Sequence, residues 1–341
     1  MTAPELFWLE AGHWDIFVAV YLFLGGVSGG SYVVASIAET VAGRSEYDGY
    51  EHVTRWGLLT AFVTIAVGSI TLLLHLSGPF IRAFTFPVSF TNWTSWMAIG
   101  TWVIVLFSLL VTVRLLWATF GAKATADPSG LPRQLVAKLG VEGLLDRLAD
   151  ATRPTGILDM GVRLVGVGLA VLVVVYTGLL LSDVGWNVPL WDPRLLPLLF
   201  LASGVSAGTA AVVMLAQLAS NIDSHLVHRF SLFDDAVITV EIVILGILLY
   251  TLATGGVAAT ETYASLTGPY GPLLWVGVLG LGLVVPLLIS GAQQAVEFLR
   301  EENKLMTKPI CSAKFGLVIA GSFMLRFLIV YAAIHQPVVV G

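Results

Sequence analysis

WDIFVAVYLFLGGVSGGSYVVASI, residues 14–37, is an apolar stretch without a single Lys or Arg. A helix needs about 20 mostly apolar residues to cross the hydrocarbon core of a bilayer. Seven further stretches qualify, at roughly 56–77, 94–117, 160–182, 195–219, 234–254, 270–293 and 315–336. The sequence therefore predicts an all-α polytopic membrane protein with eight transmembrane helices.

Composition excludes a soluble fold, because 57% of the 341 residues are hydrophobic and 11% are charged, against about 25% charged in soluble proteins. The only cysteine, Cys311, excludes an internal disulfide and a four-cysteine iron–sulfur cluster within this chain. No Lys or Arg precedes Arg44, so we expect no cleavable signal peptide and a first apolar stretch that is retained as a helix.

The basic residues predict the orientation. With the N-terminus outside, most Lys and Arg residues fall in inner loops or at inner helix ends, as the positive-inside rule requires: Arg44, Arg55, Arg114, Lys123, Arg133, Lys138, Arg147, Arg153, Arg163, Arg229, Arg300, Lys304, Lys308 and Lys314. Only Arg82 and Arg194 fall outside. We therefore predict a multi-pass protein of the cytoplasmic (inner) membrane with both termini outside.

Two other features fit this topology. Several tryptophans fall at the outer boundary, where an aromatic belt is expected: Trp8, Trp14, Trp93, Trp96, Trp186 and Trp191. The inner loop at about 118–159 interleaves leucines with charges, which predicts an amphipathic segment on the membrane surface.

A short internal repeat divides the chain. Residues 26–31 read GVSGGS and residues 204–209 read GVSAGT, in spans that run in the same direction. We infer two four-helix bundles related by a parallel repeat, 1–182 with the inner loop and 183–341. The pairs Gly25/Gly29, Gly26/Gly30 and Gly204/Gly208 are small-xxx-small motifs, which favour close helix packing. They are also compatible with a groove for a flat ligand.

Charged residues inside spans are expensive and therefore candidates for function. Asp234 and Glu241 are one heptad apart on the sixth span, which places Glu241 about seven residues from the inner end of that span, and Arg326 lies deep in the eighth. We interpret these three residues as a candidate proton path. A purely structural role is equally compatible with the sequence.

A second polar group gathers at the predicted outer ends. Its candidate catalytic residues are Asp15, Tyr21 and His75, and its candidate quinone-binding residues are His13, Tyr21, Gly25, Gly29, His75, Arg82 and Trp96. A quinone head group needs donors to both carbonyls, a proton source and an apolar slot, which these residue types supply. The sequence shows a shared depth, and their convergence in space is an expectation.

The histidines argue against a haem protein. Of six histidines, only His75 and His335 fall plausibly within spans, whereas a transmembrane cytochrome b holds each haem between histidines on facing helices. Two such haems are excluded. With no haem or iron–sulfur cluster expected in this chain, electrons must come from a partner.

Several segments together resemble the NrfD/PsrC family, the membrane subunits of polysulfide reductase type. The resemblance rests on YLFLGGVSGGSY at 21–32, HLSGPFIRAF at 75–84, SWMAIG at 95–100, PLLFLASGVSAGTA at 197–210, Glu241, 275–286 and 321–326. Two features depart from the family pattern. Ser77 stands before Gly78 and Arg82 comes three residues after Pro79, which puts the role of Arg82 in doubt, and the 118–159 loop matches no family motif.

The resemblance implies an integral subunit of a respiratory oxidoreductase that binds quinone, menaquinone or ubiquinone, near the outer face. It also implies a ferredoxin-like iron–sulfur partner subunit and a catalytic subunit, often a molybdopterin enzyme, on the outer face. Membrane lipids are the other expected partners, and no nucleic acid is expected. Two alternatives fit the same residues: an ion or solute transporter, and a structural membrane anchor of a soluble enzyme.

Overall fold

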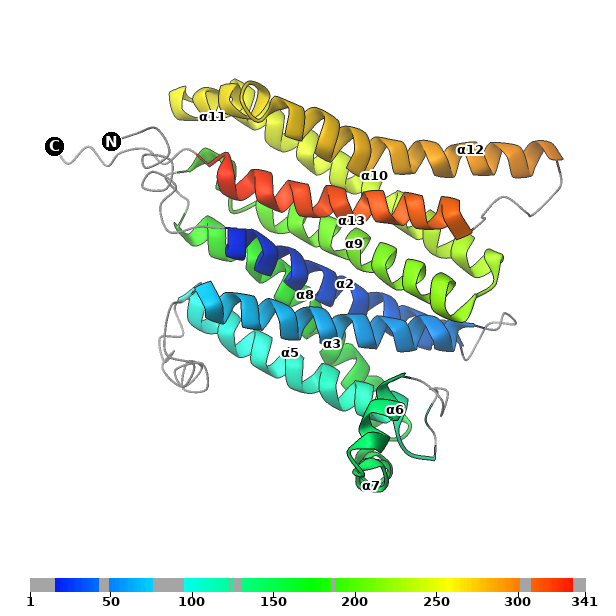
Figure 1. Cartoon of the computed structure of the whole chain (residues 1–341). Coiled ribbons are helices and arrows are strands. Elements are labelled where there is room, and N and C mark those ends of the chain that lie inside the picture. Colours follow the sequence, from blue (N-terminus) through cyan, green and yellow to red (C-terminus); the bar gives the residue numbers. More distant parts are fainter. Residues whose placement is uncertain are drawn as a thin grey trace.

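A computed structural model describes residues 16–42, 49–75, 95–122, 124, 131–184, 188–300 and 308–333 of the chain (Figure 1). These residues are almost entirely helical and contain no strand. Their elements are α2 (Ile16–Ala42), α3 (Tyr50–His75), α5 (Trp96–Thr119), α6 (Leu131–Lys138), α7 (Glu142–Thr152), α8 (Ile157–Val184), η2 (Pro189–Trp191), α9 (Leu196–Ser220), α10 (Ser224–Thr254), α11 (Val257–Thr267), η3 (Leu273–Val284), α12 (Val285–Arg300) and α13 (Lys308–Tyr331).

The predicted spans are confirmed, because eight helices among the described residues are long and apolar enough to cross a membrane. They run side by side along one direction, which is the long axis of the molecule in Figure 1. The seventh combines the π-helix η3 with α12. We call the end where α2 begins and α13 ends the predicted outer end, and the opposite end the predicted inner end.

One boundary differs in a way that matters. α10 begins at Ser224, ten residues before the predicted start, because the Asp223 side chain accepts a hydrogen bond from the His225 backbone N–H and caps the helix. Leu226, Val227 and Phe230 are then buried in the core. Glu241 consequently lies near the middle of α10 rather than close to its inner end.

The helices that carry the repeated glycine motifs pack against each other at the centre of the molecule. A Cβ on Gly30 would collide with the backbone of Gly204, and one on Gly208 would collide with the backbone of Gly30. The absence of side chains therefore lets α2 and α9 approach at backbone distance. α2 also contacts α3, α8 and α13, and α9 also contacts α8, α10 and α13. The division into two four-helix bundles stays a prediction.

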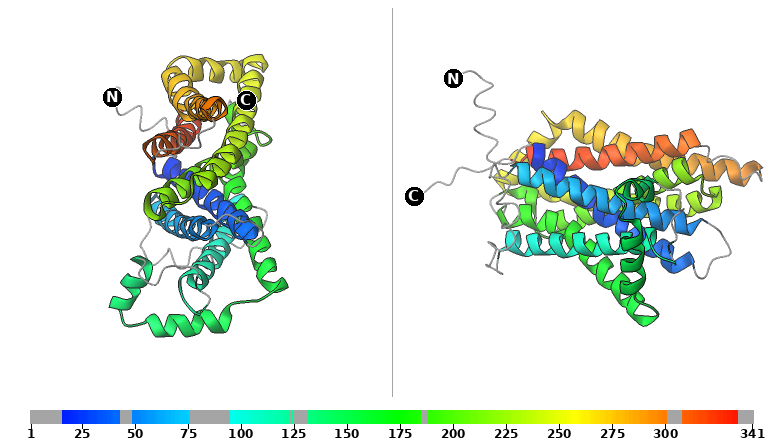
Figure 2. Two further views of the ribbon diagram at one scale, coloured as in Figure 1. Left: turned by 90° about the vertical axis from the view of Figure 1, so that its right-hand side faces the viewer. Right: turned by 60° about the horizontal axis from the view of Figure 1, so that its bottom comes forward.

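The predicted surface segment contains two short helices, α6 and α7. Figure 1 views α7 down its axis, and Figure 2 shows it lying across the direction of the spans. Carboxylates fix α7 to the end of α5, because Asp146 accepts from the Gly121 N–H and Asp150 from the Ala122 N–H. Leu144 and Leu148 point outward and are exposed. Its location on the membrane surface stays a prediction.

Three residues are more buried than their place in the sequence suggested. Trp191, expected in an aromatic belt, is fully buried and its Nε1 donates to the Ile329 carbonyl at 2.9 Å. Arg114 and Lys314, which we counted among the charges of inner helix ends, are 4% and 0% exposed and form ion pairs with Glu39 and Asp235. These two cations therefore belong to the interior rather than to the basic inner surface.

Candidate functional site

The outer polar group is only partly described by the structure. His13, Asp15 and Arg82 lie outside the described residues, and His75 is the last residue of α3. Trp96 is half-buried and begins α5. The convergence of these five residues with Tyr21 stays a prediction.

Tyr21 is the best-defined member of this group. Its side chain is 2% exposed, and its hydroxyl has no hydrogen-bond partner among the described residues. The Tyr176 side chain, on α8, is close enough for its hydroxyl to interact with that of Tyr21. Tyr176 packs over Gly100 of α5, where a Cβ would run into the phenol ring. α2, α5 and α8 thus hold two phenols together near the predicted outer end.

Tyr176 was missed by the sequence reasoning. No polar neighbour in its own span, LAVLVVVYTGLLL at 169–181, marks it as special except Thr177. The signal that could have found it is the glycine at position 100, one turn after Trp96, because such a glycine leaves room for an aromatic ring from a facing helix.

The two glycines proposed to line a groove both face α8. A Cβ on Gly25 would be in ordinary contact with Thr177 at 3.6 Å. A Cβ on Gly29 would collide with Val174 and with the Ala170 carbonyl. Gly29 therefore serves the close packing of α2 on α8, whereas Gly25 leaves room for one more methyl group.

Arg326 occupies the interface of α2, α9 and α13 and is fully buried. Its Nη1 donates to the hydroxyls of Ser203 and Ser322, at 3.0 and 2.6 Å. Its Nε donates to the Leu22 carbonyl at 3.3 Å, and its guanidinium lies against Gly26. The arginine thus reaches α2 one residue away from Tyr21.

Glu241 is 2% exposed and completes this cluster from α10. Its carboxyl neighbours Ser203 and is within electrostatic range of Arg326. A cation, a carboxyl and two hydroxyls from three different helices therefore share one buried site. A buried charge of this kind is tolerated only when a partner and hydrogen bonds compensate for its lost hydration.

Asp234 links this cluster to the predicted inner end. The Ser206 hydroxyl donates to Asp234 Oδ1 at 2.6 Å, while Asp234 Oδ2 has no partner among the described residues. Asp234 and Glu241 are separated by about 10 Å along α10. Ser206 and Ser203 lie one turn apart on α9, so their hydroxyls line the same interval.

A buried ion pair extends the polar line further. Lys314 Nζ lies 2.7 Å from Asp235 and donates to the Ser231 hydroxyl at 2.6 Å. Ser290 of α12 donates to Asp235 at 3.0 Å. From Lys314 to Arg326 the line covers about 18 Å along α13. The predicted proton path did not include Asp235, Lys314 or the serines of this line. Their place in it depends on how each helix is rotated against its neighbours.

No group of three or more His, Cys, Asp or Glu side chains among the described residues is arranged to hold a metal ion.

The chain is similar to one protein family over nearly its whole length. The model of the family described as "Polysulphide reductase, NrfD" matches residues 7–338. Protein NrfD of Escherichia coli is 31% identical over 345 residues, 97% of this chain and 98% of its own. The C chain of polysulfide reductase from Wolinella succinogenes is 31% identical over 329 residues, 94% of this chain and 93% of its own. An NrfD homolog of Haemophilus influenzae is 30% identical, and the match covers 94% of both proteins.

Proposed function

Since this chain belongs to the NrfD family and is therefore a multi-pass membrane subunit of an oxidoreductase complex, we propose that it exchanges electrons between the quinone pool and a partner iron–sulfur subunit. The proposed site for the quinone head group lies at the predicted outer end, around Tyr21. The name of the Wolinella relative, the C chain of polysulfide reductase, likewise describes one subunit of a redox complex.

The single observation that carries this proposal is the buried hydroxyl of Tyr21, which faces the Tyr176 side chain and makes no hydrogen bond of good geometry with the described residues. A buried polar group without a partner costs about 1–3 kcal/mol, so such groups are rare unless a ligand or water completes them. A quinone carbonyl is an acceptor that fits this donor. The flanking apolar residues Val18 and Leu22 are buried as well, which suits the remainder of a flat ring.

Quinone, when bound, supplies two-electron chemistry coupled to two protons. In the proposal Tyr21, assisted by His75 and Arg82, donates hydrogen bonds to the carbonyls and fixes their orientation. His13 and Asp15 exchange protons with the predicted outer surface. Gly25 and Trp96 complete the lining of the proposed site.

The electrons must reach this site from another protein, because one cysteine cannot hold a cluster. We propose a ferredoxin-like iron–sulfur subunit on the outer face, coupled to a catalytic subunit that is a molybdopterin enzyme. Electron transfer between them requires the terminal cluster to lie close to Tyr21, which favours docking at the outer end of α2.

The polar line through α9, α10 and α13 is the proposed proton path. It begins at Asp235 and Lys314, passes Asp234 and Glu241, and ends at Arg326. Because Arg326 bonds the backbone of Leu22, this path ends beside Tyr21. Orphaned oxygens at Asp234 and Asp235 indicate places for water molecules that would connect the side chains.

The proposal is tested by quinone-coupled turnover of the purified complex with Tyr21→Phe and His75→Ala. Loss of the Tyr21 hydroxyl removes one hydrogen bond of roughly 1–3 kcal/mol, so turnover should fall about 10- to 100-fold. The control is Tyr250→Phe, because Tyr250 is 68% exposed on the outside of α10. Full activity of both site variants, with the complex intact, would contradict the proposal.

Tyr176 gives a second test. Gly100→Ala adds one methyl group where the Tyr176 ring lies, so the ring must move away from Tyr21. We expect turnover to fall by about tenfold while the folded protein is retained. The matched control is Gly316→Ala, where the added methyl group meets no atom within 4 Å. Equal turnover of the two variants would show that the position of Tyr176 is irrelevant to the site.

A transporter is the second candidate, and the buried Lys314–Asp235 pair favours it, since buried ion pairs also serve substrate and ion pathways. The two functions differ in their partners. If the chain is a quinone-reactive subunit, affinity purification of the intact protein should also yield a second subunit. The absorption spectrum of that subunit should show an iron–sulfur cluster that can be oxidised and reduced. A protein that purifies alone and conducts ions in liposomes would favour the transporter.

A further inference from the structure

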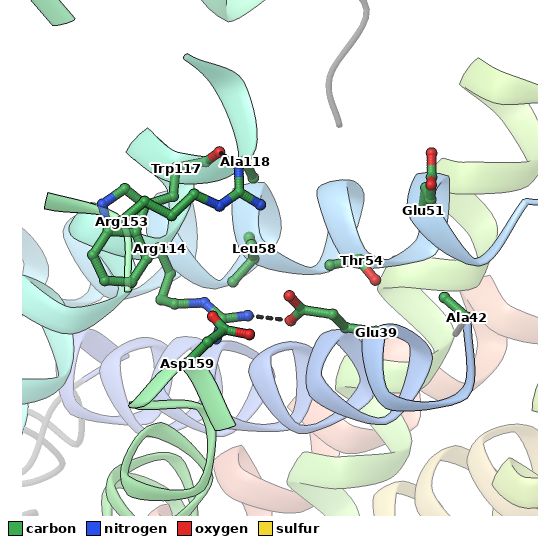
Figure 3. Close-up of a pocket in the computed structure, with 10 residues that line it drawn as sticks. All are labelled: Glu39, Ala42, Glu51, Thr54, Leu58, Arg114, Trp117, Ala118, Arg153 and Asp159. Carbon is green, nitrogen blue, oxygen red and sulfur yellow. Dashed lines mark hydrogen bonds and ion pairs between the residues drawn. The ribbon is translucent and has the colours of Figure 1, made fainter. Parts of the chain in front are cut away.

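A cavity of about 120 Å³ opens at the predicted inner end, on the side of α2 opposite the polar line described above. The last turns of α2 and α5 meet the first turns of α3 and α8 around it (Figure 3). Its charged lining residues are Glu39, Glu51, Arg114, Arg153 and Asp159. None of these residues has a role in the site proposed at the predicted outer end.

The Glu39–Arg114 ion pair lies at the base of this cavity (Figure 3). Arg114 is 4% exposed, and its Nη1 is buried without a hydrogen-bond partner among the described residues. The Glu39 side chain retains 29% exposure. The pair therefore joins a carboxylate that water can reach to a buried donor that has spare hydrogen-bonding capacity.

The size and charge of the cavity identify its occupant as water. A volume of 120 Å³ accepts several water molecules, because one needs only about 10–15 Å³ of such space. This volume is well below the roughly 300–1,000 Å³ of typical small-molecule sites. Three carboxylates and two guanidinium groups nearly balance, so neither a phosphate nor a cation is strongly favoured. A cavity lined by carboxylates and guanidinium groups takes up water readily.

From Glu39, buried hydroxyls continue along the same face of α2 toward the middle of the helix. Ser36 and Tyr32 follow at helical spacings of three and four residues, and their hydroxyls are buried. The two side chains are close enough to interact with each other. The Tyr32 hydroxyl lies within electrostatic range of Arg114, Glu39 and Arg163. Tyr21 lies on this face too, eleven residues before Tyr32, or about 16 Å along the helix.

We propose that Glu39 exchanges protons between this water-filled cavity and the hydroxyls of Ser36 and Tyr32, which gives the first half of the protein its own proton entrance at the predicted inner face. The step moves a proton only. The Glu39 carboxylate takes it from cavity water that exchanges with the inner solution and passes it to the Ser36 hydroxyl. Each hydroxyl then accepts one proton and releases its own to the next acceptor, so it stays neutral, while Arg114 stabilises the carboxylate between transfers. This inference rests on the proposed quinone function for the final proton acceptor.

The groups that face Glu39 come from every neighbouring element. Arg114 of α5 pairs with it, Glu51 of α3 and Asp159 of α8 share the cavity, and Arg153 enters from the segment before α8. Arg163 of α8 is held by Asp159 at 3.1 Å. Charges of both signs therefore surround Glu39.

The first test measures access to water and needs no turnover. Ala118 lines the cavity and Ala98 is buried near the other end of the same helix. In a Cys311→Ser background, a charged membrane-impermeant thiol reagent should label Ala118→Cys from the inner face only, and should not label Ala98→Cys. No labelling of Ala118→Cys, or labelling from the outer face, would overturn the proposal.

The second test measures proton uptake from the inner side during quinone turnover in proteoliposomes of the complex. Glu39→Gln should lower inner uptake about twofold, because the path through Glu241 remains, and Glu39→Asp should restore it. Glu261→Gln, at an exposed position, should change nothing. Glu39→Gln/Arg114→Gln removes the pair without leaving a buried unpaired charge, so it should fold and show the same loss. Unchanged uptake in both Gln variants would overturn the proposal.

The two proposals fail separately. If wild-type complex shows no quinone turnover, the quinone function fails, and the labelling pattern still decides whether the cavity is open to inner water. If turnover is normal and Glu241→Gln alone abolishes inner uptake, protons enter only through the second half and Glu39 is not an entrance.

Discussion

Replacing Arg326 with Met is expected to destabilise the protein by about 3–5 kcal/mol, the cost of breaking a buried, hydrogen-bonded charge cluster by removing one partner. The hydroxyls of Ser203 and Ser322 lose a charged donor, and so does the Leu22 carbonyl. Glu241 is left in an apolar interior without a nearby cation. Quinone-coupled proton uptake from the predicted inner side should fall about twofold, because the proposed entrance at Glu39 remains. Titration with a denaturing detergent, followed by helical circular dichroism, measures the stability loss.

The double variant Arg326→Met/Glu241→Gln separates packing from proton transfer. It removes both charges, so we expect it to recover at least half of the lost stability and none of the lost proton uptake. Arg326→Lys keeps the charge but replaces a planar donor fork with a compact ammonium group, and should lie between wild type and Arg326→Met. A single Arg326→Met variant within about 1 kcal/mol of wild type would show that the cluster contributes little to the fold.

Replacing Gly208 with Leu is expected to abolish the folded protein. A Cβ on Gly208 already meets the backbone of Gly30 and Ser31 on α2, and backbone atoms, unlike flexible side chains, cannot rotate aside. Even modest overpacking costs about 1–3 kcal/mol, and here the two central helices must separate along their whole contact. The yield of monodisperse protein in size-exclusion chromatography gives the result.

Gly246→Leu is the matched control for Gly208→Leu. Gly246 lies on the exposed face of α10, and an added Cβ meets nothing within 4 Å. Gly246→Leu should give the elution profile of the wild type. Gly30→Ala should give a yield of monodisperse protein between those of Gly246→Leu and Gly208→Leu. Normal yield of Gly208→Leu would show that α2 and α9 do not pack at backbone distance.

Much of the architecture could be predicted from patterns within single helices. Each span is recognisable by its roughly 20 apolar residues, because the thickness of a bilayer sets that length. The glycine repeats at 26–31 and 204–209 marked the helices that meet at the centre, since only small residues allow such an approach. Asp234, Glu241 and Arg326 were marked by the cost of charge in an apolar span.

The partners of those charges could not be predicted. Ser203 and Ser322 are ordinary residues of apolar helices until helix rotation places both beside Arg326. Lys314 looks like a basic residue at an inner helix end, and only the packing of α10 against α13 buries it beside Asp235. The true start of α10 depended on a cap at Asp223 and on buried Phe230, so Glu241 was placed too near the inner end.

The number of spans, their direction relative to one another and the membrane class of the protein follow from the amino-acid sequence alone, because these properties depend on composition within one helix. Which helix faces meet is a property of the folded molecule: glycine on glycine between α2 and α9, Tyr176 beside Tyr21, and Glu39 with Arg114 at an inner cavity. Such meetings depend on the rotation of each helix about its axis. That rotation is set by contacts with several other helices at once, which no single stretch of sequence encodes.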